Sequence, residues 1–243
     1  MLKNTTTKKR MAIISSVTVC LIAASVLVAW IASRKQSEPT VDGNIKASPI
    51  VNIEAVRTNA ERGDAQAQKD LGRLYARGEL VPQNYDEAAK WYRQSAEQGY
   101  APAQAALGEL YEAGRGVPHD DAEAAKWYRR AAESGDPSGQ YSLAVLYVMG
   151  QGVRRDNAEA LKWYRQAADR GLALAQYNLG MRYYEGTAVA PDPVEAYKWL
   201  SLAAAQGIPD ADKARTTLKE RMTSAQIDDA KRRVKAFAAK KTG

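Results

Sequence analysis

A pattern that returns every 36 residues is the strongest constraint on how this chain can fold. Tryptophan, alanine and glycine all recur at that interval: Trp91, Trp127, Trp163 and Trp199; Ala96, Ala132, Ala168 and Ala204; Gly99, Gly135, Gly171 and Gly207. Self-similarity at a fixed spacing of about 20 to 50 residues is typical of solenoids, in which no single repeat can bury its own apolar face. The period therefore predicts a stack of repeats.

Each repeat is predicted to contain two helices joined by a short turn. In the first repeat, one helix covers about residues 64–77 and ends at Gly78, and the other covers about residues 85–98 and ends at Gly99. Glycine just past a helix adopts the left-handed conformation that closes the last turn. The second helix of every repeat begins at an acid or amide, with a glutamate three residues later as in a capping box: Asn84 and Glu87, Asp120 and Glu123, Asp156 and Glu159, Asp192 and Glu195. The predicted fold class is all-α, a right-handed α-solenoid of helix-turn-helix repeats.

A framework of aromatic side chains is predicted to join the two helices of each repeat. Leu71 and Tyr75 lie four residues apart on the first helix, so both face the side that meets the second helix. Small residues such as Gly72 are expected to let the helices approach closely around the tryptophan rings. The framework comprises the four tryptophans and the four tyrosines Tyr75, Tyr111, Tyr147 and Tyr183.

Atypical helices are expected on both sides of the regular repeats. Residues 63–211 hold four repeats and the start of a fifth, which decays where Arg215 replaces the framework leucine. Residues 48–62, with Ser48 as N-cap, are predicted to form an N-terminal capping helix, and residues 212–243 to form C-terminal capping helices. The last helix has a cationic side that is either a solvated face or a patch for an acidic partner or anionic lipid: Lys231, Arg232, Arg233 and Lys235.

Residues 11–33 form an uncharged segment of 23 residues. As a helix it would reach roughly 34 Å, enough to cross about 30 Å of hydrocarbon. A cleaved signal peptide is the alternative, although its apolar region usually has only about 7 to 15 residues and Trp30 disrupts the best cleavage site. More cations precede the segment than follow it, which places the N-terminus in the cytoplasm. We expect a cytoplasmic basic tail at residues 1–10, a transmembrane signal-anchor helix at residues 11–33 and a flexible tether at residues 34–47.

The net charge of +7 belongs to this N-terminal region. Residues 1–35 contain six of the 35 Lys and Arg residues and no acid, which leaves 29 cations against 28 acids in the rest of the chain. The repeats are therefore nearly neutral, and no nucleic-acid partner is predicted. One cysteine, Cys20, and one histidine, His119, exclude a disulfide within the chain and make a Cys/His metal site unfavourable.

Catalytic chemistry is not indicated by any motif. His119 precedes Asp120, yet it stands at a loop position that Gln83, Arg155 and Pro191 occupy in the other repeats. It is therefore interpreted as a loop residue before a helix cap rather than as a general base. Phosphate loops, metal motifs and nucleophile elbows do not occur in the sequence. We predict no catalytic residue, no metal, no cofactor and no small-molecule substrate.

The repeats resemble the SEL-one-like repeat (SLR), a relative of the tetratricopeptide repeat. Residues 96–128 match nearly in full the pattern Ala-Glu-x-Gly-x-x-x-Ala-x-x-x-Leu-Gly-x-x-Tyr-x-x-Gly-x-Gly-Val, then Asp-x-x-x-Ala-x-x-Trp-Tyr. The resemblance covers about residues 60–211 and is specific for the fold. Members of this family look like adaptors and scaffolds, many of them in bacterial envelopes, where they assemble membrane complexes or regulate signalling, secretion or polysaccharide export.

The resemblance implies a non-enzymatic scaffold, adaptor or regulator that binds protein partners of the cell envelope. It is expected in the bacterial inner membrane, single-pass, with the repeats in the periplasm. A scaffold that faces the cytoplasm and a protein secreted after cleavage are alternatives. A further alternative is an envelope enzyme of the penicillin-binding or β-lactamase-like kind, because some secreted members, whose helix pairs are joined by disulfides, have been associated with penicillin binding. This chain lacks those cysteines.

The candidate partner-binding residues are those that vary while the framework stays constant. In tetratricopeptide arrays the first helix lines the concave face, and here its inward positions change from charged to aromatic and apolar along the chain. The predicted binding residues are Lys69, Arg73, Arg77, Glu109, Tyr141, Val145, Met149, Tyr177, Met181 and Tyr184. A contiguous exposed patch of this kind anchors partner peptides. The alternative is that these side chains pack between adjacent helices or under the C-terminal cap.

Overall fold

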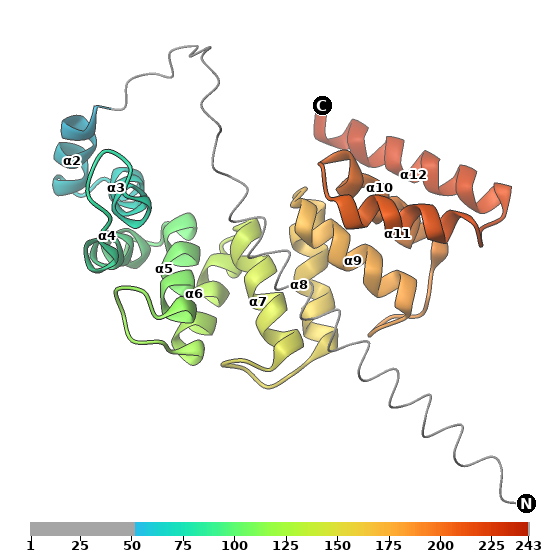
Figure 1. The fold of residues 1–243 in the computed structure, drawn as a ribbon, viewed down its shortest axis with the longest axis horizontal. Coiled ribbons are helices and arrows are strands. Elements are labelled where there is room, and N and C mark those ends of the chain that lie inside the picture. The colour runs from blue at the N-terminus through green and yellow to red at the C-terminus, as the bar shows by residue number, and fades with distance from the viewer. Residues whose placement is uncertain (1–51, 243) are drawn as a thin grey trace, which may run out of the picture. The chain divides into compact units, whose positions relative to one another are not determined.

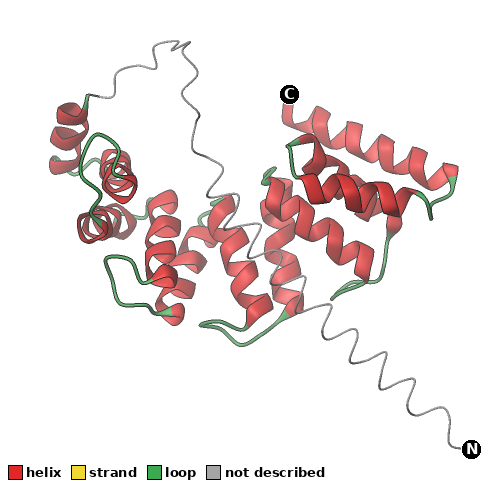
Figure 2. Cartoon of the chain, viewed as in Figure 1, coloured by secondary structure: helices red, strands yellow, loops and turns green. Residues whose placement is uncertain are grey.

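The computed structural model describes residues 52–242, which form eleven α-helices and contain no strand (Figure 1, Figure 2). In chain order the helices are α2 (Ile53–Glu61), α3 (Ala65–Arg77), α4 (Tyr85–Glu97), α5 (Ala101–Ala113), α6 (Asp121–Glu133), α7 (Pro137–Met149), α8 (Asn157–Asp169), α9 (Ala173–Glu185), α10 (Pro193–Ala205), α11 (Pro209–Lys219) and α12 (Ser224–Thr242). The four repeats are the pairs α3 and α4, α5 and α6, α7 and α8, and α9 and α10. The predicted all-helical repeat solenoid is confirmed.

Consecutive helices pack on each other along the array. From α2 to α11 each helix contacts the next in chain order, and the first helices α5 and α7 also contact each other (Figure 1). The last helix, α12, packs on α10. Because each helix packs mainly on its neighbours, the buried apolar side chains form four clusters along the array, the largest from α7 to α12, rather than one central core.

The second helix of each repeat begins at the predicted cap. The side chains of Asn84, Asp120, Asp156 and Asp192 accept hydrogen bonds from backbone N–H groups of the first helical turn. The predicted reciprocal half of the capping box is wrong. The backbone N–H of Asp156 donates to the carbonyl of Tyr147 at 2.9 Å, and the other three caps donate in the same way to their framework tyrosines. Since that donor is already satisfied, each capping-box glutamate pairs with the lysine three residues later instead.

The side chains at the closest approach of the helices are Tyr92 and Tyr128 in the first two repeats and Leu200 in the fourth, not the tryptophans that the sequence indicated. A Cβ atom on Gly72 would lie 2.7 Å from Cδ1 of Tyr92, and one on Gly108 would lie 2.8 Å from Cδ1 of Tyr128. Trp127, one residue before Tyr128, is only 7% exposed but belongs to the core around α5. Successive residues of a helix point about 100° apart, so the tryptophan and the following tyrosine face different neighbours.

A buried glutamine links each repeat to the one before it. Nε2 of Gln104 donates to the carbonyl of Ala96 at 3.1 Å, and Nε2 of Gln140 donates to that of Ala132 at 3.2 Å. Gln68 and Gln176 make the same contact. Sequence reasoning missed this framework position, although glutamine stands there in all four repeats.

The described ends of the array are capped by helices. The side chain of Asn52 caps α2, whereas Ser48 lies outside the described residues. At the other end a capping box precedes α12: Gln226 N donates to Thr223 Oγ1 at 3.3 Å, and Thr223 N donates to Gln226 Oε1 at 2.9 Å. Phe237 of α12 packs edge-on against Trp199, with the ring centroids 5.3 Å apart.

The N-terminal predictions concern residues that the structure does not describe. The basic tail at 1–10, the membrane segment at 11–33, the tether at 34–47 and Cys20 all lie outside residues 52–242. Among residues 52–242, none of the helices combines the length and the apolar character that membrane crossing requires.

Candidate partner-binding surface

The first-helix face consists of the variable positions of α3, α5, α7 and α9 that the sequence indicated for binding. Its N-terminal part, on α3, is cationic. Lys69 pairs with Asp70 at 3.3 Å, and Arg73 and Arg77 both pair with Glu79, at 2.7 and 3.3 Å. These three cations are thus partly neutralised by acids of their own repeat, and Arg77 is the most exposed of them.

The α5 section of the first-helix face is acidic. Tyr128 Oη donates to Glu112 Oε2 at 2.6 Å. Burial, reinforced by the charge of Glu112, raises the pKa of Tyr128 well above its usual value. The half-buried Glu109 acts in the same direction on the pKa of Tyr92, where burial is again the main cause. In chain order, the cations of α3 are therefore followed by two carboxylates of α5, which act on the buried tyrosines Tyr92 and Tyr128.

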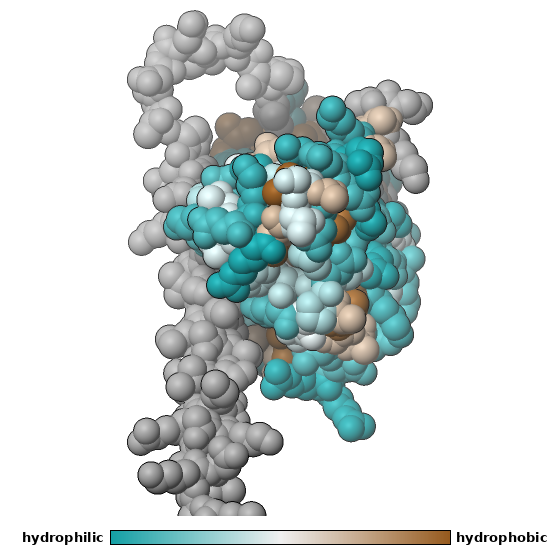
Figure 3. Space-filling view, turned by 90° about the vertical axis from the view of Figure 1, so that its right-hand side faces the viewer, coloured by the Kyte–Doolittle hydropathy of each residue, from teal (hydrophilic) through white to brown (hydrophobic). Residues whose placement is uncertain are grey.

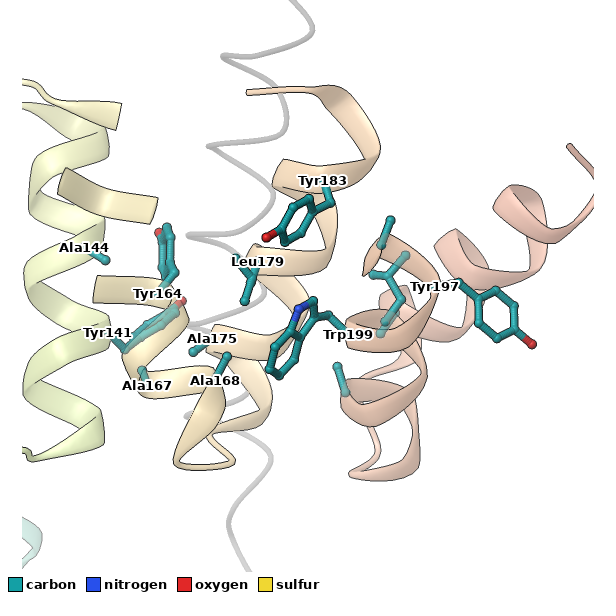
Figure 4. Close-up of a cluster of buried hydrophobic side chains, with 14 of the residues drawn as sticks. Tyr141, Ala144, Tyr164, Ala167, Ala168, Ala175, Leu179, Tyr183, Tyr197 and Trp199 are labelled. Carbon is teal, nitrogen blue, oxygen red and sulfur yellow. The ribbon is translucent and has the colours of Figure 1, made fainter. Parts of the chain in front are cut away.

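Tyr141 is part of the core rather than of the open surface. Its side chain is only 6% exposed, and its ring lies beside that of Tyr164, with the centroids 5.8 Å apart (Figure 4). Burial raises its pKa, and a hydrogen bond with Asn178 acts in the opposite direction. The alternative reading, that such side chains pack between adjacent helices, holds for this residue, because its position on α7 faces the following repeat.

An apolar patch completes the first-helix face at its C-terminal part. Met149 is exposed at 43%, and the remaining members are half-buried against one core cluster. We refer to this set as the apolar patch: Val145, Met149, Tyr177, Met181 and Tyr184. Half-burial fixes these side chains while leaving part of each ring or chain open to solvent.

Arg182 is a residue of this region that sequence reasoning missed. It occupies the position of the buried leucines Leu74, Leu110 and Leu146 of the other repeats. Its guanidinium carbon lies 5.9 Å from the centroid of the Tyr164 ring. Burial raises the pKa of Tyr164 to about 12, and the charge of Arg182 opposes that rise. The sequence does hold a signal for this residue, because Arg182 is a charged residue at a position where the other three repeats have leucine.

His119 contributes to the structure of the turn after α5. Its Nδ1 lies 2.9 Å from the carbonyl oxygen of Glu112, and its Nε2 lies 3.6 Å from Asp121. Gln83 at the same position of the preceding repeat donates to the carbonyl of Ala76 at 2.9 Å. Both side chains bind an unpaired carbonyl at the end of the first helix, as the loop interpretation expected.

The surface of the C-terminal end is mostly hydrophilic. Seen from the side on which α12 lies, polar residues predominate and apolar areas are small and separate (Figure 3). The cationic side of α12 is exposed: Lys231, Arg232, Arg233 and Lys235. Arg233 binds Glu195 of α10 at 2.6 Å, so one of these cations helps to hold α12 in place. Among the residues that the structure describes, three or more potential metal ligands do not gather anywhere.

Comparison with known proteins identifies the repeat. A sequence model described as the Sel1 repeat matches residues 65–100, 101–136, 137–172 and 173–208, together 144 of the 243 residues. The matched boundaries coincide with the helix pairs from α3 and α4 to α9 and α10. A search of curated proteins finds no match.

Two of the solved structures that are similar to this chain show the relationship. The first is a protective antigen of uropathogenic Escherichia coli strains that displays an SLR fold, 43% identical, with a TM-score of 0.63 over 66% of this chain and 34% of that protein. This chain thus spans about a third of its length. The second is a Sel1 repeat protein from Oxalobacter formigenes, 32% identical, with a TM-score of 0.63 over 73% of this chain and 75% of that one.

Sel1 repeat proteins generally mediate protein–protein interactions and are typically non-enzymatic scaffolds. The matched repeats cover more than half of the sequence, and their framework positions are those that pack the helices. The chain therefore belongs to the Sel1 repeat family.

Proposed function

We propose that the protein is an interaction scaffold whose first-helix face binds a segment of a partner protein. The observation that carries the proposal is the contrast between a constant framework and a changing face. Tryptophan, the capping residue and the buried glutamine recur in every repeat, whereas the face changes from cations on α3 through acids on α5 to the apolar patch on α7 and α9. Stacking accounts for the change at Tyr141, which is buried, but not for the change at the exposed and half-buried positions of the face.

The apolar patch is the proposed anchor of the partner segment. Its members Tyr177, Met181 and Tyr184 rest on the core and therefore lose little side-chain freedom when a partner covers them. Tyrosine and methionine supply large contact areas at such sites. The charged sections of α3 and α5 would then set the direction of the bound segment, because cations, acids and the apolar patch follow one another in a fixed order along the face.

Photo-crosslinking from single positions of the full-length chain tests this proposal. A photoreactive amino acid is placed at Met149 or at Tyr184, and for control at Lys162, which is exposed on the second helix α8. We expect a discrete crosslinked partner from Met149 and Tyr184 and none from Lys162. Absence of a product at both patch positions, or equal yields at Lys162, would rule out the first-helix face as the binding surface.

We further propose that residues 11–33 anchor this scaffold in a bacterial inner membrane, with the repeats in the periplasm. The absence of charge over 23 residues and the cations before them support this placement. In carbonate-washed membranes we expect the full chain to remain in the pellet and a variant lacking residues 11–33 to be released. In spheroplasts, added protease should digest the repeats. Protection of the repeats would instead favour the cytoplasm-facing alternative.

A further inference from the structure

An open pocket lies at the turn between α7 and α8, apart from the first-helix face. Its volume is about 520 Å³. It is lined by Arg129 of α6, Tyr147 of α7, Glu159 of α8 and the turn residues 153–156. Figure 2 shows this turn as a loop that projects beyond the ends of the helices. Of the turn residues in the lining, Val153 packs against a core cluster, whereas Arg154 and Arg155 are exposed.

Three arginines give this pocket a cationic wall. Arg129 is held in place, because its Nη2 donates to Tyr147 Oη at 2.8 Å and its guanidinium carbon lies 5.8 Å from that ring. Arg154 and Arg155 are exposed and have no hydrogen bond or ion pair with any residue that the structure describes. The pocket thus combines one ordered guanidinium with two that are free to bind a ligand.

The two carboxylates of the lining are already engaged. Asp156 Oδ1 accepts the backbone N–H groups of Ala158 and Glu159, at 2.9 and 3.0 Å. Glu159 is paired with Lys162. These acids therefore neutralise the arginines only in part, and an incoming anionic group would find unpaired guanidinium donors.

The preceding repeat supplies an internal comparison. The positions that correspond to the pocket lining hold the same residue in five cases: Arg93, Tyr111, Val117, Asp120 and Glu123. Only the two turn positions differ, with Pro118 and His119 in place of Arg154 and Arg155. His119 contacts the carbonyl of Glu112 at the end of α5, whereas Arg155 forms no such bond. The same turn forms in the preceding repeat without arginine at either position, so Arg154 and Arg155 are not required for the turn.

We propose that the pocket formed by Arg129, Arg154 and Arg155 binds an acidic segment of a partner protein. The planar guanidinium group binds carboxylates through two parallel hydrogen bonds, which suits side chains of aspartate and glutamate. Sel1 repeat proteins bind protein partners. Because the pocket is open to solvent, an extended segment of a partner can enter it. This site is separate from the first-helix face, so either can fail without the other.

A turn exchange tests the proposal with little risk to folding. The variant Arg154→Pro/Arg155→His copies the turn that the chain itself uses at Pro118 and His119, on an otherwise identical lining. The probe is a fluorescently labelled glutamate tetrapeptide with the full-length protein in detergent. Because the contacts are solvent-exposed, we expect the exchange to weaken binding about fivefold, and binding to weaken further as salt rises from about 0.01 to about 0.15 M.

A charge-matched control separates the pocket from general attraction. Lys231→Ala/Lys235→Ala also removes two positive charges, but from the exposed side of α12. It should leave the affinity for the peptide within about twofold of wild type. The opposite exchange, Pro118→Arg/His119→Arg, should create a second site and raise the peptide stoichiometry. Unchanged affinity after the Arg154/Arg155 exchange, equal loss in the α12 control, or no peptide binding to wild type would each overturn the proposal. Saturable binding of inorganic phosphate without peptide binding would overturn it in favour of a phosphate site.

Discussion

Two glycines show how single residues set the spacing of the repeats. Gly116 and Gly152 have positive φ values of 66° and 63°, and a Cβ atom on either would lie about 2 Å from the carbonyl oxygen of the first residue of the preceding second helix. The turn of one repeat thus rests directly on the backbone of the repeat before it. At the equivalent positions of the first and last repeats, Leu80 and Ala188 keep the same positive φ with a side chain present.

Alanine at Gly152 should therefore destabilise the protein more than alanine at a glycine with open surroundings. Gly99 has a positive φ of 86° but nothing within 4 Å of a built Cβ, so Gly99→Ala adds only conformational strain, roughly 1 to 2 kcal/mol. Gly152→Ala adds overlap with the Asp121 carbonyl and should cost at least about 1 kcal/mol more. Urea unfolding of both variants measures the difference. Equal losses would show that the turn moves away freely.

The buried tyrosines predict unfolding at alkaline pH. Burial raises the pKa values of Tyr92, Tyr128, Tyr141 and Tyr164, the last to about 12. The unfolded chain loses these protons near pH 10, while the folded protein retains them, so rising pH favours the unfolded state. Each such tyrosine lowers stability by up to about 1.4 kcal/mol per pH unit between its two pKa values.

We expect stability to be insensitive to these groups below about pH 9 and to fall steeply above about pH 10. Tyr164→Phe should reduce the slope of that fall, since it removes one of the titrating groups. Guanidinium unfolding at a series of pH values tests this expectation. A slope that Tyr164→Phe leaves unchanged would show that Tyr164 ionises in the folded state at its ordinary pKa.

At the scale of helices, the sequence was informative where one residue acts on its own backbone. The caps at Asp120 and Asp156 and the glycine at the end of each first helix were predictable, because these interactions are local. Contacts between helices were less so. The burial of Tyr141 depends on Tyr164 of the second helix of its own repeat and on Asn178 of the next repeat, and neither contact can be located from the sequence alone. The packing of Tyr92 on Gly72 likewise required knowledge of how the second helix is rotated.

The exposure of the proposed first-helix binding face was predictable in part for the same reason. Variation between repeats located the first-helix face, but exposure depends on neighbouring repeats, and so Tyr141 was wrongly placed on the open surface. Arg154 and Arg155 were not predictable from helix patterns, because they differ from their counterparts only in a turn.

Trp127 provides a test of the helix framework. It is 7% exposed, and the guanidinium carbon of Arg130 lies 4.6 Å from its ring centroid. Truncation of a buried aromatic side chain leaves a cavity, so Trp127→Ala should lower the free energy of unfolding by about 3 to 5 kcal/mol. Its exposed neighbour gives a control, because Lys126→Ala should change stability by less than about 1 kcal/mol. A Trp127→Ala variant as stable as wild type would contradict the packing around α5.

At the scale of the molecule, the fixed period means that each repeat contacts its two neighbours through corresponding residues. Removing residues 101–136 joins Tyr100 to Pro137 and leaves the framework in register. Gln140 can then donate to Ala96 as Gln104 does, and Arg93 to Tyr147 as it does to Tyr111. Each interface has a counterpart that already exists in the protein.

We therefore expect the chain without residues 101–136 to fold, with helical circular dichroism per residue close to that of the full chain and lower stability because one interface is lost. Removal of residues 101–118, half a repeat, should prevent cooperative folding, since a second helix would follow another second helix. If both deletions unfold alike, stability does not arise from equivalent repeats.

The central claim is that constant positions fold this protein and variable positions on the first helices bind its partner. Replacing the α9 residues by their α3 counterparts, Tyr177→Lys, Met181→Arg and Tyr184→Ala, changes only the variable positions. The decisive measurement is the partner crosslinking yield from a photoreactive residue at Met149 in this variant, with circular dichroism to confirm its fold. We predict a folded protein that has lost the crosslink. A folded variant that crosslinks its partner as wild type does would contradict the claim.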